Sequence, residues 1–395
     1  MLKFIQNYLT NRKQTVFNGN LYSELLSITI GVPQGSVLGP LFFLIYINDL
    51  IYSQCTCATP NCTSNCLDVA SFILFADDTN LFVEGNSIEE VTCKINDILG
   101  KLKLYLEANY LHINVSKSKF INFKTPRQNT RDEFDVDIRF GVTPLQKVNS
   151  IKFLGVIIDE RLCWAKQTQH ITCKVRSSIA QLYEMRKILP KTLKNTVYNS
   201  IVNSQLTYAI SVWGAYSNVD RLKPIFLLQK RALRNLFGIK RVSKHIKGHT
   251  KPIFNQNNIM TVYSIYNYMS ILCLNKLLIL EEPKYLYDIL RLKPQGSLRN
   301  ERIYVPSLKL KHYHNNFCYQ APKIWNFIGS NSSHCNNVIH APSINSMKSR
   351  LKSFLLKMQS HGHDVNEYSW NRSNSCIEVY VNMIKNEPQS TSQTY

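Results

Sequence analysis

The amino-acid sequence predicts an α+β fold for residues 1–164 and a mainly α-helical region after them. Two observations support the first part: short segments rich in β-branched and aromatic residues concentrate before residue 164, and a long segment with helical spacing separates two groups of them. A third supports the second part, because apolar residues keep helical spacing beyond Trp164. We therefore expect an antiparallel sheet with helices on one face, followed by helices.

The first fifty residues predict a helix, a strand pair and a second helix. Apolar spacing indicates a helix over residues 2–12, and residues 15–17 and 25–30 are β-formers around an Asn18-Gly19-Asn20 turn. A glycine-bracketed loop at residues 31–36 precedes Pro40, a typical first helical residue. The apolar run after Pro40 predicts a helix to Leu50 that is buried on nearly all sides.

Two acidic residues lie on the turn of the next predicted hairpin. Residues 72–75 and 80–83 read as strands hinged at residues 76–79, so Asp77 and Asp78 fall on the turn. Ser87 and Glu90 form a capping box for a helix that ends near residue 108. We then expect a second strand pair at residues 111–115 and 119–123, a polar loop at 128–137 and a third hairpin within residues 138–158.

The helical spacing beyond residue 165 predicts the domain organisation. We expect one domain at residues 1–164, a basic helical region at 165–250 and a further helical region at 251–367. Residues 368–395 are mostly polar, and we expect the end of this tail to be disordered.

The charge and the cysteine content restrict the class of protein. Lys and Arg outnumber Asp and Glu by 47 to 26, which favours a nucleic-acid partner over an ordinary basic protein. The N-terminus lacks the apolar stretch of a signal peptide, and no apolar run reaches the ~20 residues of a membrane span. An odd number of cysteines, 11, argues against a disulfide framework. We expect an intracellular protein of the nucleus or cytoplasm.

The adjacent carboxylates of Asp77 and Asp78 are the sharpest chemical feature. They repel each other unless a cation shares them, and Mg²⁺ prefers such hard oxygen ligands. A pair of Mg²⁺ ions can activate an attacking hydroxyl and stabilise a leaving oxygen, as in polymerases and nucleases. Taken alone, a solvated Asp-Asp turn is the simpler interpretation.

Four motifs in one order resemble a known family. The strings GVPQGSVLGPLFFLIYINDL, FADDTNLF, LHINVSKSKFINF and IKFLGVIID are similar to reverse transcriptases of non-LTR (LINE-type) retrotransposons, the jockey-like group in particular. The later strings TLKNTVYNSIVNSQLTYAISVWG, LQKRALRNLFGI and YQAPKIWNFI resemble the helical region that follows the polymerase core. The resemblance covers roughly residues 1–357, and it implies a partial palm followed by a helical thumb.

The resemblance assigns roles to residues near the acidic turn. It makes Asp77 the stronger metal ligand and Asp78 its partner, after the pair Phe75-Ala76, where the family more often has Tyr than Phe. Lys117 matches a lysine near the nucleotide phosphates. Three further residues match the loop against the incoming nucleotide and template: Gln34, Gly35 and Ser36. Phe153, Leu154 and Gly155 match the primer grip.

The implied activity is that of an RNA-directed DNA polymerase. It would use Mg²⁺ and deoxynucleotides to extend a DNA primer on an RNA template. In this family a further metal-binding aspartate and the fingers subdomain precede the helix that begins here at Met1. We therefore expect an underligated metal site, and the alternative function is a catalytically inactive remnant that at most binds nucleic acid.

Two clusters of residues suggest further binding sites. Nine cations between residues 221 and 247 would track nucleic-acid phosphates, or form a solvated face; the strongest candidates are Lys230, Arg231, Arg234, Lys240 and Arg241. Four cysteines, Cys55, Cys57, Cys62 and Cys66, could bind zinc, although they lack paired Cys-x₂-Cys spacing and a loop without metal is the simpler interpretation. The remaining alternative is a Cys-rich metal-binding protein with an incidental Asp-Asp turn.

Overall fold

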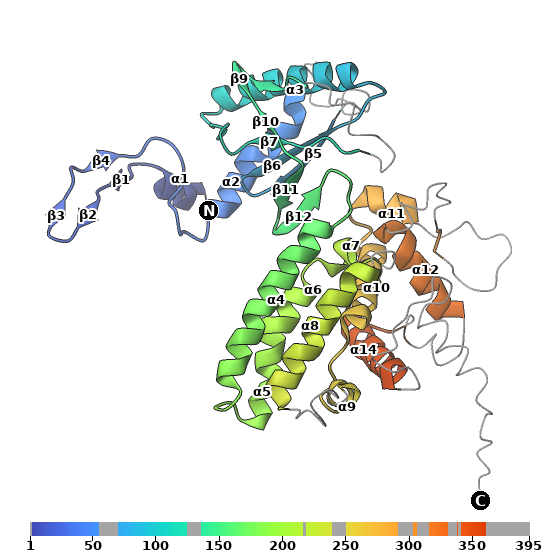
Figure 1. Cartoon of the computed structure of the whole chain (residues 1–395). Coiled ribbons are helices and arrows are strands. Elements are labelled where there is room, and N and C mark those ends of the chain that lie inside the picture. Colours follow the sequence, from blue (N-terminus) through green and yellow to red (C-terminus); the bar gives the residue numbers. More distant parts are fainter. Residues whose placement is uncertain are drawn as a thin grey trace, which may run out of the picture. The chain divides into compact units, whose positions relative to one another are not determined.

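The computed structural model describes residues 2–54, 70–124, 136–215, 219–238, 250–290, 303–305, 316–330, 338 and 341–360 (Figure 1). The chain divides into two compact units, Met1–Ile151 and Lys152–Tyr395. The first is α+β and the second is helical apart from its opening hairpin and an isolated bridge at Ile303, which confirms the predicted fold class.

The first unit opens with a helix and a narrow ribbon. Helix α1 (Leu2–Leu9) ends before Asn11, which has a positive φ of 57°. Strand β1 (Lys13–Gln14) pairs antiparallel with β4 (Leu26–Ser27), and β2 (Phe17–Asn18) pairs with β3 (Leu21–Tyr22). The turn at Gly19, with φ +65°, confirms the predicted reversal.

Helix α2 (Gly39–Ile47) is more exposed than its composition predicts. It begins with Pro40 at the expected place and continues into the 3₁₀ helix η1 (Asn48–Gln54). Ile47 and Leu50 are buried, but Leu44 and Ile45 are 50% and 63% exposed within the chain. The prediction of a helix buried on nearly all sides is wrong for the described chain, because only one face of α2 packs against the core of its unit.

A hairpin and a long helix form the centre of the first unit. Strands β5 (Ala70–Phe75) and β6 (Asp78–Val83) pair antiparallel over their whole length. Helix α3 (Ile88–Ala108) begins at Ser87, whose hydroxyl accepts the Glu90 N–H, while the Glu90 carboxylate accepts the Asn86 N–H at 3.0 Å. The capping box is therefore confirmed. The core between them is aliphatic and aromatic, and includes Ile47, Leu50, Leu99, Leu102, Leu106, Phe72, Leu74 and Leu81.

The predicted strand pair after α3 is only partly present. Strand β7 (Lys119–Phe120) exists, but it pairs in parallel with β10 (Gln146–Lys147). Residues 111–115 form no strand, because the Asn114 side chain and carbonyl accept hydrogen bonds from the turn that follows. A short hairpin of β8 (Arg139–Phe140) and β9 (Thr143–Pro144) lies within the predicted third hairpin region.

The second unit begins earlier than the helical spacing predicts. Strand β11 (Ser150–Phe153) pairs with β12 (Val156–Asp159), and helix α4 (Ala165–Met185) follows. The Gln167 side chain of α4 accepts the Ile157 N–H at 2.9 Å, and Val156 and Trp164 belong to the helical core. The hairpin therefore belongs to the helical unit, so the division falls at Ile151/Lys152 and not near residue 165.

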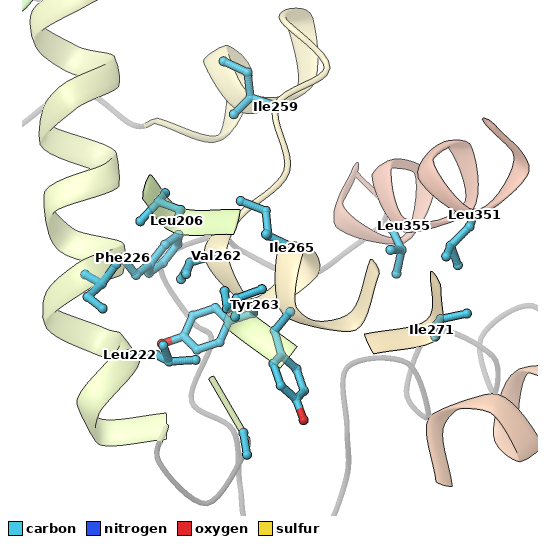
Figure 2. Close-up of a cluster of buried hydrophobic side chains, with 14 of the residues drawn as sticks. Leu206, Leu222, Phe226, Ile259, Val262, Tyr263, Ile265, Ile271, Leu351 and Leu355 are labelled. Carbon is cyan, nitrogen blue, oxygen red and sulfur yellow. The ribbon is translucent and has the colours of Figure 1, made fainter. Parts of the chain in front are cut away.

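Further helices build the second unit around a single core. Helices α8 (Val219–Phe237) and α4 pack against each other, and helix α10 (Val262–Leu280) contacts several of the others. Figure 2 shows side chains of α8, α10 and α14 that gather in this core. The remaining elements are α5 (Lys191–Tyr198), the π-helix η2 (Asn199–Asn203), α6 (Ser204–Thr207), α7 (Ile210–Trp213), α9 (Lys251–Gln256), α11 (Lys284–Leu290), α12 (Phe317–Ser330) and α14 (Ile344–Ser360).

Two buried glutamines bind the backbone before α10, and one of them, Gln229, connects residues on both sides of the predicted boundary at residue 250. The Gln229 side chain of α8 donates to the Met260 carbonyl and accepts the Val262 N–H, both at 2.9 Å. The Gln359 side chain of α14 donates to the Ile259 carbonyl and accepts the Thr261 N–H, both at 3.1 Å. The described residues from Val156 to Met358 share one core, so the regions 165–250 and 251–367 do not form separate compact units in this structure.

Candidate active site

The two aspartates lie at the exposed end of the β5–β6 hairpin. Phe75 pairs with Asp78, so Ala76 and Asp77 form the turn and Asp78 is the first residue of β6. Phe72 and Leu74 pack on the core from β5, and Leu81 packs on it from β6. Both carboxylates are exposed to solvent. A rigid hairpin therefore carries a pair of accessible hard oxygen ligands at its tip.

The glycine-bracketed loop is held by Ser36. The Ser36 hydroxyl donates to the Pro33 carbonyl at 2.8 Å and accepts the Gly39 N–H at 3.0 Å. Gly31 and Gly35 have φ values of +87° and +83°. Gln34 and Gly35 are exposed. The loop thus presents Gln34 and Gly35 to solvent, while Ser36 connects the loop to the start of α2.

The sequence interpretation missed Gly39 in this loop. A Cβ atom at Gly39 would lie 2.8 Å from the Ser36 hydroxyl oxygen and 3.2 Å from the Pro33 carbonyl oxygen. A larger residue there would displace the Ser36 hydroxyl from both of its hydrogen bonds. The signal in the sequence is the Gly39-Pro40 pair, of which Pro40 alone predicts the start of α2.

Lys117 lies on a turn that Asn114 organises. The Asn114 side-chain oxygen accepts the Ser116 hydroxyl at 2.7 Å, and its carbonyl accepts the Lys117 N–H at 3.1 Å. The Lys117 side chain is exposed. Ile113 and Phe120, on either side of the turn, pack against the core that also anchors the acidic hairpin. One core of the first unit therefore supports the acidic hairpin and the turn of Lys117. The Gly31–Ser36 loop is bonded to the start of α2, whose Phe43 and Ile47 pack in the same core.

The donor chemistry at the hairpin tip fits Mg²⁺. Mg²⁺ sites in proteins commonly use one or two carboxylates together with water and substrate phosphates. Among the residues that the structure describes, no cluster of three or more His, Cys, Asp or Glu side chains could hold a metal ion. Asp77 and Asp78 would supply two carboxylates to such an ion, and the remaining oxygens would come from outside the described residues or from substrate.

The proposed primer-grip residues form the turn of the β11–β12 hairpin in the second unit. Leu154 and Gly155 have φ values of +43° and +83°. The Tyr208 hydroxyl donates to the Leu154 carbonyl. Sequence interpretation did not single out Tyr208, although it lies in one of the strings that resemble the family's helical region.

The basic residues of α8 differ in their access to solvent. Arg231 is exposed, but Lys230 is 5% exposed and its ammonium nitrogen lies 4.4 Å from the centre of the Phe226 ring. Arg234 is partly buried, and this burial lowers the pKa of its guanidinium. A phosphate needs an accessible cation, so Arg231 is the exposed one of the three strongest candidates on α8, and Lys223 of the same cluster is exposed as well. Lys240 and Arg241 lie outside the described residues.

The proposed zinc ligands Cys55, Cys57, Cys62 and Cys66 also lie outside the described residues. No helix in the described part of the chain combines the length and apolar character needed to cross a membrane.

Comparison with known proteins gives consistent matches for part of the chain. Residues 2–158 match the family described as reverse transcriptase (RNA-dependent DNA polymerase). A probable RNA-directed DNA polymerase from transposon X-element of Drosophila melanogaster is 25% identical over 59% of this chain and 24% of its own length. The RNA-directed DNA polymerases from mobile element jockey of Drosophila melanogaster and Drosophila funebris are 26% and 27% identical, over 59% and 60% of this chain and 25% of their own lengths.

These matches agree with the acidic hairpin and the α+β first unit. Over residues 2–158 the chain is similar to the reverse transcriptases. It is also similar to the jockey-like RNA-directed DNA polymerases of non-LTR retrotransposons. It spans about a quarter of the length of these relatives.

Proposed function

We propose that this chain carries the nucleotide-adding site of an RNA-directed DNA polymerase that extends a DNA primer on an RNA template. The observation that carries the proposal is the β5–β6 hairpin, which presents Asp77 and Asp78 together at an exposed and well-supported tip. The match of residues 2–158 to the reverse transcriptases supports it. The protein would work in the nucleus, the cytoplasm or both.

Different residues of the first unit would have different roles in nucleotide addition. Asp77 and Asp78 would hold Mg²⁺, which when bound supplies charge stabilisation of the reacting phosphate. Lys117 would neutralise charge on the nucleotide phosphates or donate a proton to the leaving pyrophosphate. Gln34 and Gly35 would lie against the incoming nucleotide and the template, on the loop that Ser36 holds. Phe75 and Ala76 would contact the nucleotide beside the acidic pair.

Primer extension on an RNA template with Mg²⁺ and deoxynucleotides tests this proposal. The chain is compared with its Asp77→Asn variant and with Glu84→Gln, which removes an exposed charge just beyond the other end of the hairpin. We expect Asp77→Asn to reduce extension at least about a hundredfold and Glu84→Gln to change it less than twofold. Equal activity in all three proteins would contradict the assignment.

A second form of the protein tests whether inactivity comes from a wrong assignment of residues or from the parts of the relatives that the chain does not span. The same assay is run on a fusion in which the chain replaces the matched residues of the X-element relative, since the chain spans 24% of that relative. Extension by the fusion that is lost with Asp77→Asn supports the proposed residues. Absence of extension from both the chain and the fusion would favour an inactive remnant.

A further inference from the structure

The turn of the β11–β12 hairpin has an unusual backbone conformation. Leu154 and Gly155, its central residues, both have positive φ values, as a type I′ turn requires. Glycine adopts this conformation freely, but a leucine rarely does. The surrounding structure must therefore hold Leu154 in place.

Tyr208 contacts both central residues of this turn. Its hydroxyl donates a hydrogen bond to the Leu154 carbonyl. Its ring covers Gly155, because a Cβ atom built there would lie 3.2 Å from the ring carbon Cε1 and 3.3 Å from the hydroxyl oxygen. One side chain thus supports the conformation of Leu154 and occupies the space beside Gly155.

Tyr208 is itself fixed by the core of the second unit. It lies at the break between α6 and α7, where its N–H donates to the Ser204 carbonyl at 3.3 Å. Its carbonyl accepts the indole N–H of Trp213 at 3.0 Å, and Trp213 is 1% exposed. Leu206, two residues earlier, is buried in the same core (Figure 2). The helical core therefore determines where the Tyr208 hydroxyl lies.

The hydrogen bond to Leu154 also orients a backbone donor. The peptide between Leu154 and Gly155 is planar and its C=O and N–H point in opposite directions. Because the carbonyl points to Tyr208, the Gly155 N–H points away from it. A backbone N–H held in a fixed direction is a suitable donor for a phosphate oxygen of a nucleic acid.

We propose that Tyr208 is a positioning residue for the primer, which it serves by holding the Phe153–Gly155 turn in one orientation. The inference rests on the proposed function, because the resemblance assigns this turn to the primer grip. Tyr208 acts through the turn and does not contact the reacting atoms.

The test is the Tyr208→Phe variant of the full chain, which removes the hydroxyl and keeps the ring. Tyr183→Phe is the control, because Tyr183 of α4 is 47% exposed, close to the 53% of Tyr208, and its ring lies under Arg186 at the C-terminal end of that helix. The probes are a fluorescein-labelled DNA primer on a longer RNA template and the same duplex with blunt ends. Fluorescence anisotropy gives the Kd for each, and hydrogen exchange reports on residues 150–159.

We expect Tyr208→Phe to raise the Kd for the recessed primer end about three- to tenfold, as loss of one hydrogen bond predicts. The Kd for the blunt duplex should change less than twofold, and exchange in residues 150–159 should accelerate about fivefold. A general loss of structure would raise both Kd values together, and this outcome would overturn the inference.

Two further outcomes separate the inference from the proposed function. If the wild-type chain binds the recessed end selectively and Tyr208→Phe keeps this selectivity, the inference is overturned. The proposed function then stays intact. Failure of the wild-type chain to distinguish the recessed from the blunt duplex counts against the proposed function, and the positioning role falls with it.

Discussion

Phe75 and Asp78 are the last paired residues of the β5–β6 hairpin, and the turn between them consists of Ala76 and Asp77 alone. Ala76 has a φ of +52°, a conformation that costs an ordinary residue roughly 1–2 kcal/mol. The direction of the Asp77 carboxylate therefore depends on a strained residue immediately before it. Asp78 lies on a regular strand and does not share this dependence.

The effect of a substitution at Ala76 on the stability of the turn should depend on how easily the new residue adopts a positive φ. Ala76→Val is expected to destabilise the turn by about 1–2 kcal/mol, because a β-branched residue tolerates positive φ poorly. Ala76→Gly should be neutral or stabilising by up to about 1 kcal/mol. Thermal unfolding measures both, and primer extension should fall with Val only. Equal behaviour of the two variants would show that the positive φ of Ala76 does not control the tip.

Two neighbouring basic residues of α8 should have different roles: Arg231 contacts nucleic acid and Lys230 stabilises the core. Arg231→Ala is expected to lower the slope of log Kobs against log salt by about 1 for duplex binding, because one phosphate contact is lost. Lys230→Ala should leave that slope nearly unchanged and lower the melting temperature, because Lys230 packs over Phe226 inside the unit. The reverse pattern would mean that Lys230 leaves the core when nucleic acid binds.

The difference between Lys230 and Arg231 shows what the sequence alone could predict about the basic cluster. The cluster of cations is visible in the sequence, but its members differ by helix face, and apolar neighbours decide which face is buried. Lys230 follows Gln229, which is buried, and lies one turn from Phe226. The number of cations along the sequence does not show which of them are buried. It therefore predicts one continuous stripe of exposed cations on the helix.

The sequence predicts an element correctly where the residues that determine it lie close together in the chain. The Gly19 turn, the Pro40 helix start and the Ser87–Glu90 capping box all depend on residues within a few positions of one another. Residues 111–115 were expected to be a strand, but the hydrogen bonds of Asn114 compete with a strand pair there. The Tyr208–Leu154 hydrogen bond joins residues 54 positions apart, and no local pattern announces it.

A substitution at Gly155 should reveal the contact with Tyr208. Gly155→Ala places a Cβ 3.2 Å from the Tyr208 ring at a φ of +83°, so we expect a loss of about 2 kcal/mol in unfolding free energy. In the Tyr208→Ala background the steric part disappears, and the same substitution should cost about 1 kcal/mol. Urea unfolding of the four proteins measures this coupling. Equal costs in both backgrounds would exclude a close contact in solution.

The turn before α4 should make stability depend on pH. Asp159 is 6% exposed, and its carboxylate accepts the N–H groups of Cys163, Trp164 and Arg161 at 2.9, 2.7 and 3.3 Å. Burial by itself raises the pKa of Asp159, but these hydrogen bonds hold it below its ordinary value. Since the folded pKa is the lower one, the stabilisation is present above the unfolded pKa of about 3.9 and is lost as the pH falls through the folded value.

Asp159→Asn is therefore expected to cost about 2 kcal/mol at neutral pH, and the difference from the wild-type chain should shrink below about pH 4. Asp288→Asn, at an exposed position in α11, is the matched control and should change stability by less than about 0.5 kcal/mol. Urea unfolding from pH 7 down to pH 3 measures both. A difference that grows as the pH falls would have the wrong sign for a carboxylate stabilised in its charged form.

The pair Gln229 and Gln359 should act as a coupled unit at the start of α10. Together they satisfy one backbone group on each of four consecutive residues, from the Ile259 carbonyl to the Val262 N–H, and both glutamines are fully buried. Replacement of either by Leu leaves a buried N–H and a buried carbonyl without partners, and should cost about 2–4 kcal/mol.

The double variant should cost less than the sum of the two single variants. Once one glutamine is lost, the segment that both hold is free to move toward water, so the second loss strands fewer buried groups. Gln181→Leu, on the exposed face of α4, should cost less than about 0.5 kcal/mol. Urea unfolding of the single and double variants gives the coupling free energy, which we expect to exceed about 0.5 kcal/mol. Strictly additive costs would mean that α8 and α14 hold α10 independently, and the helices after residue 250 would then be less tightly connected to α8 than the shared core indicates.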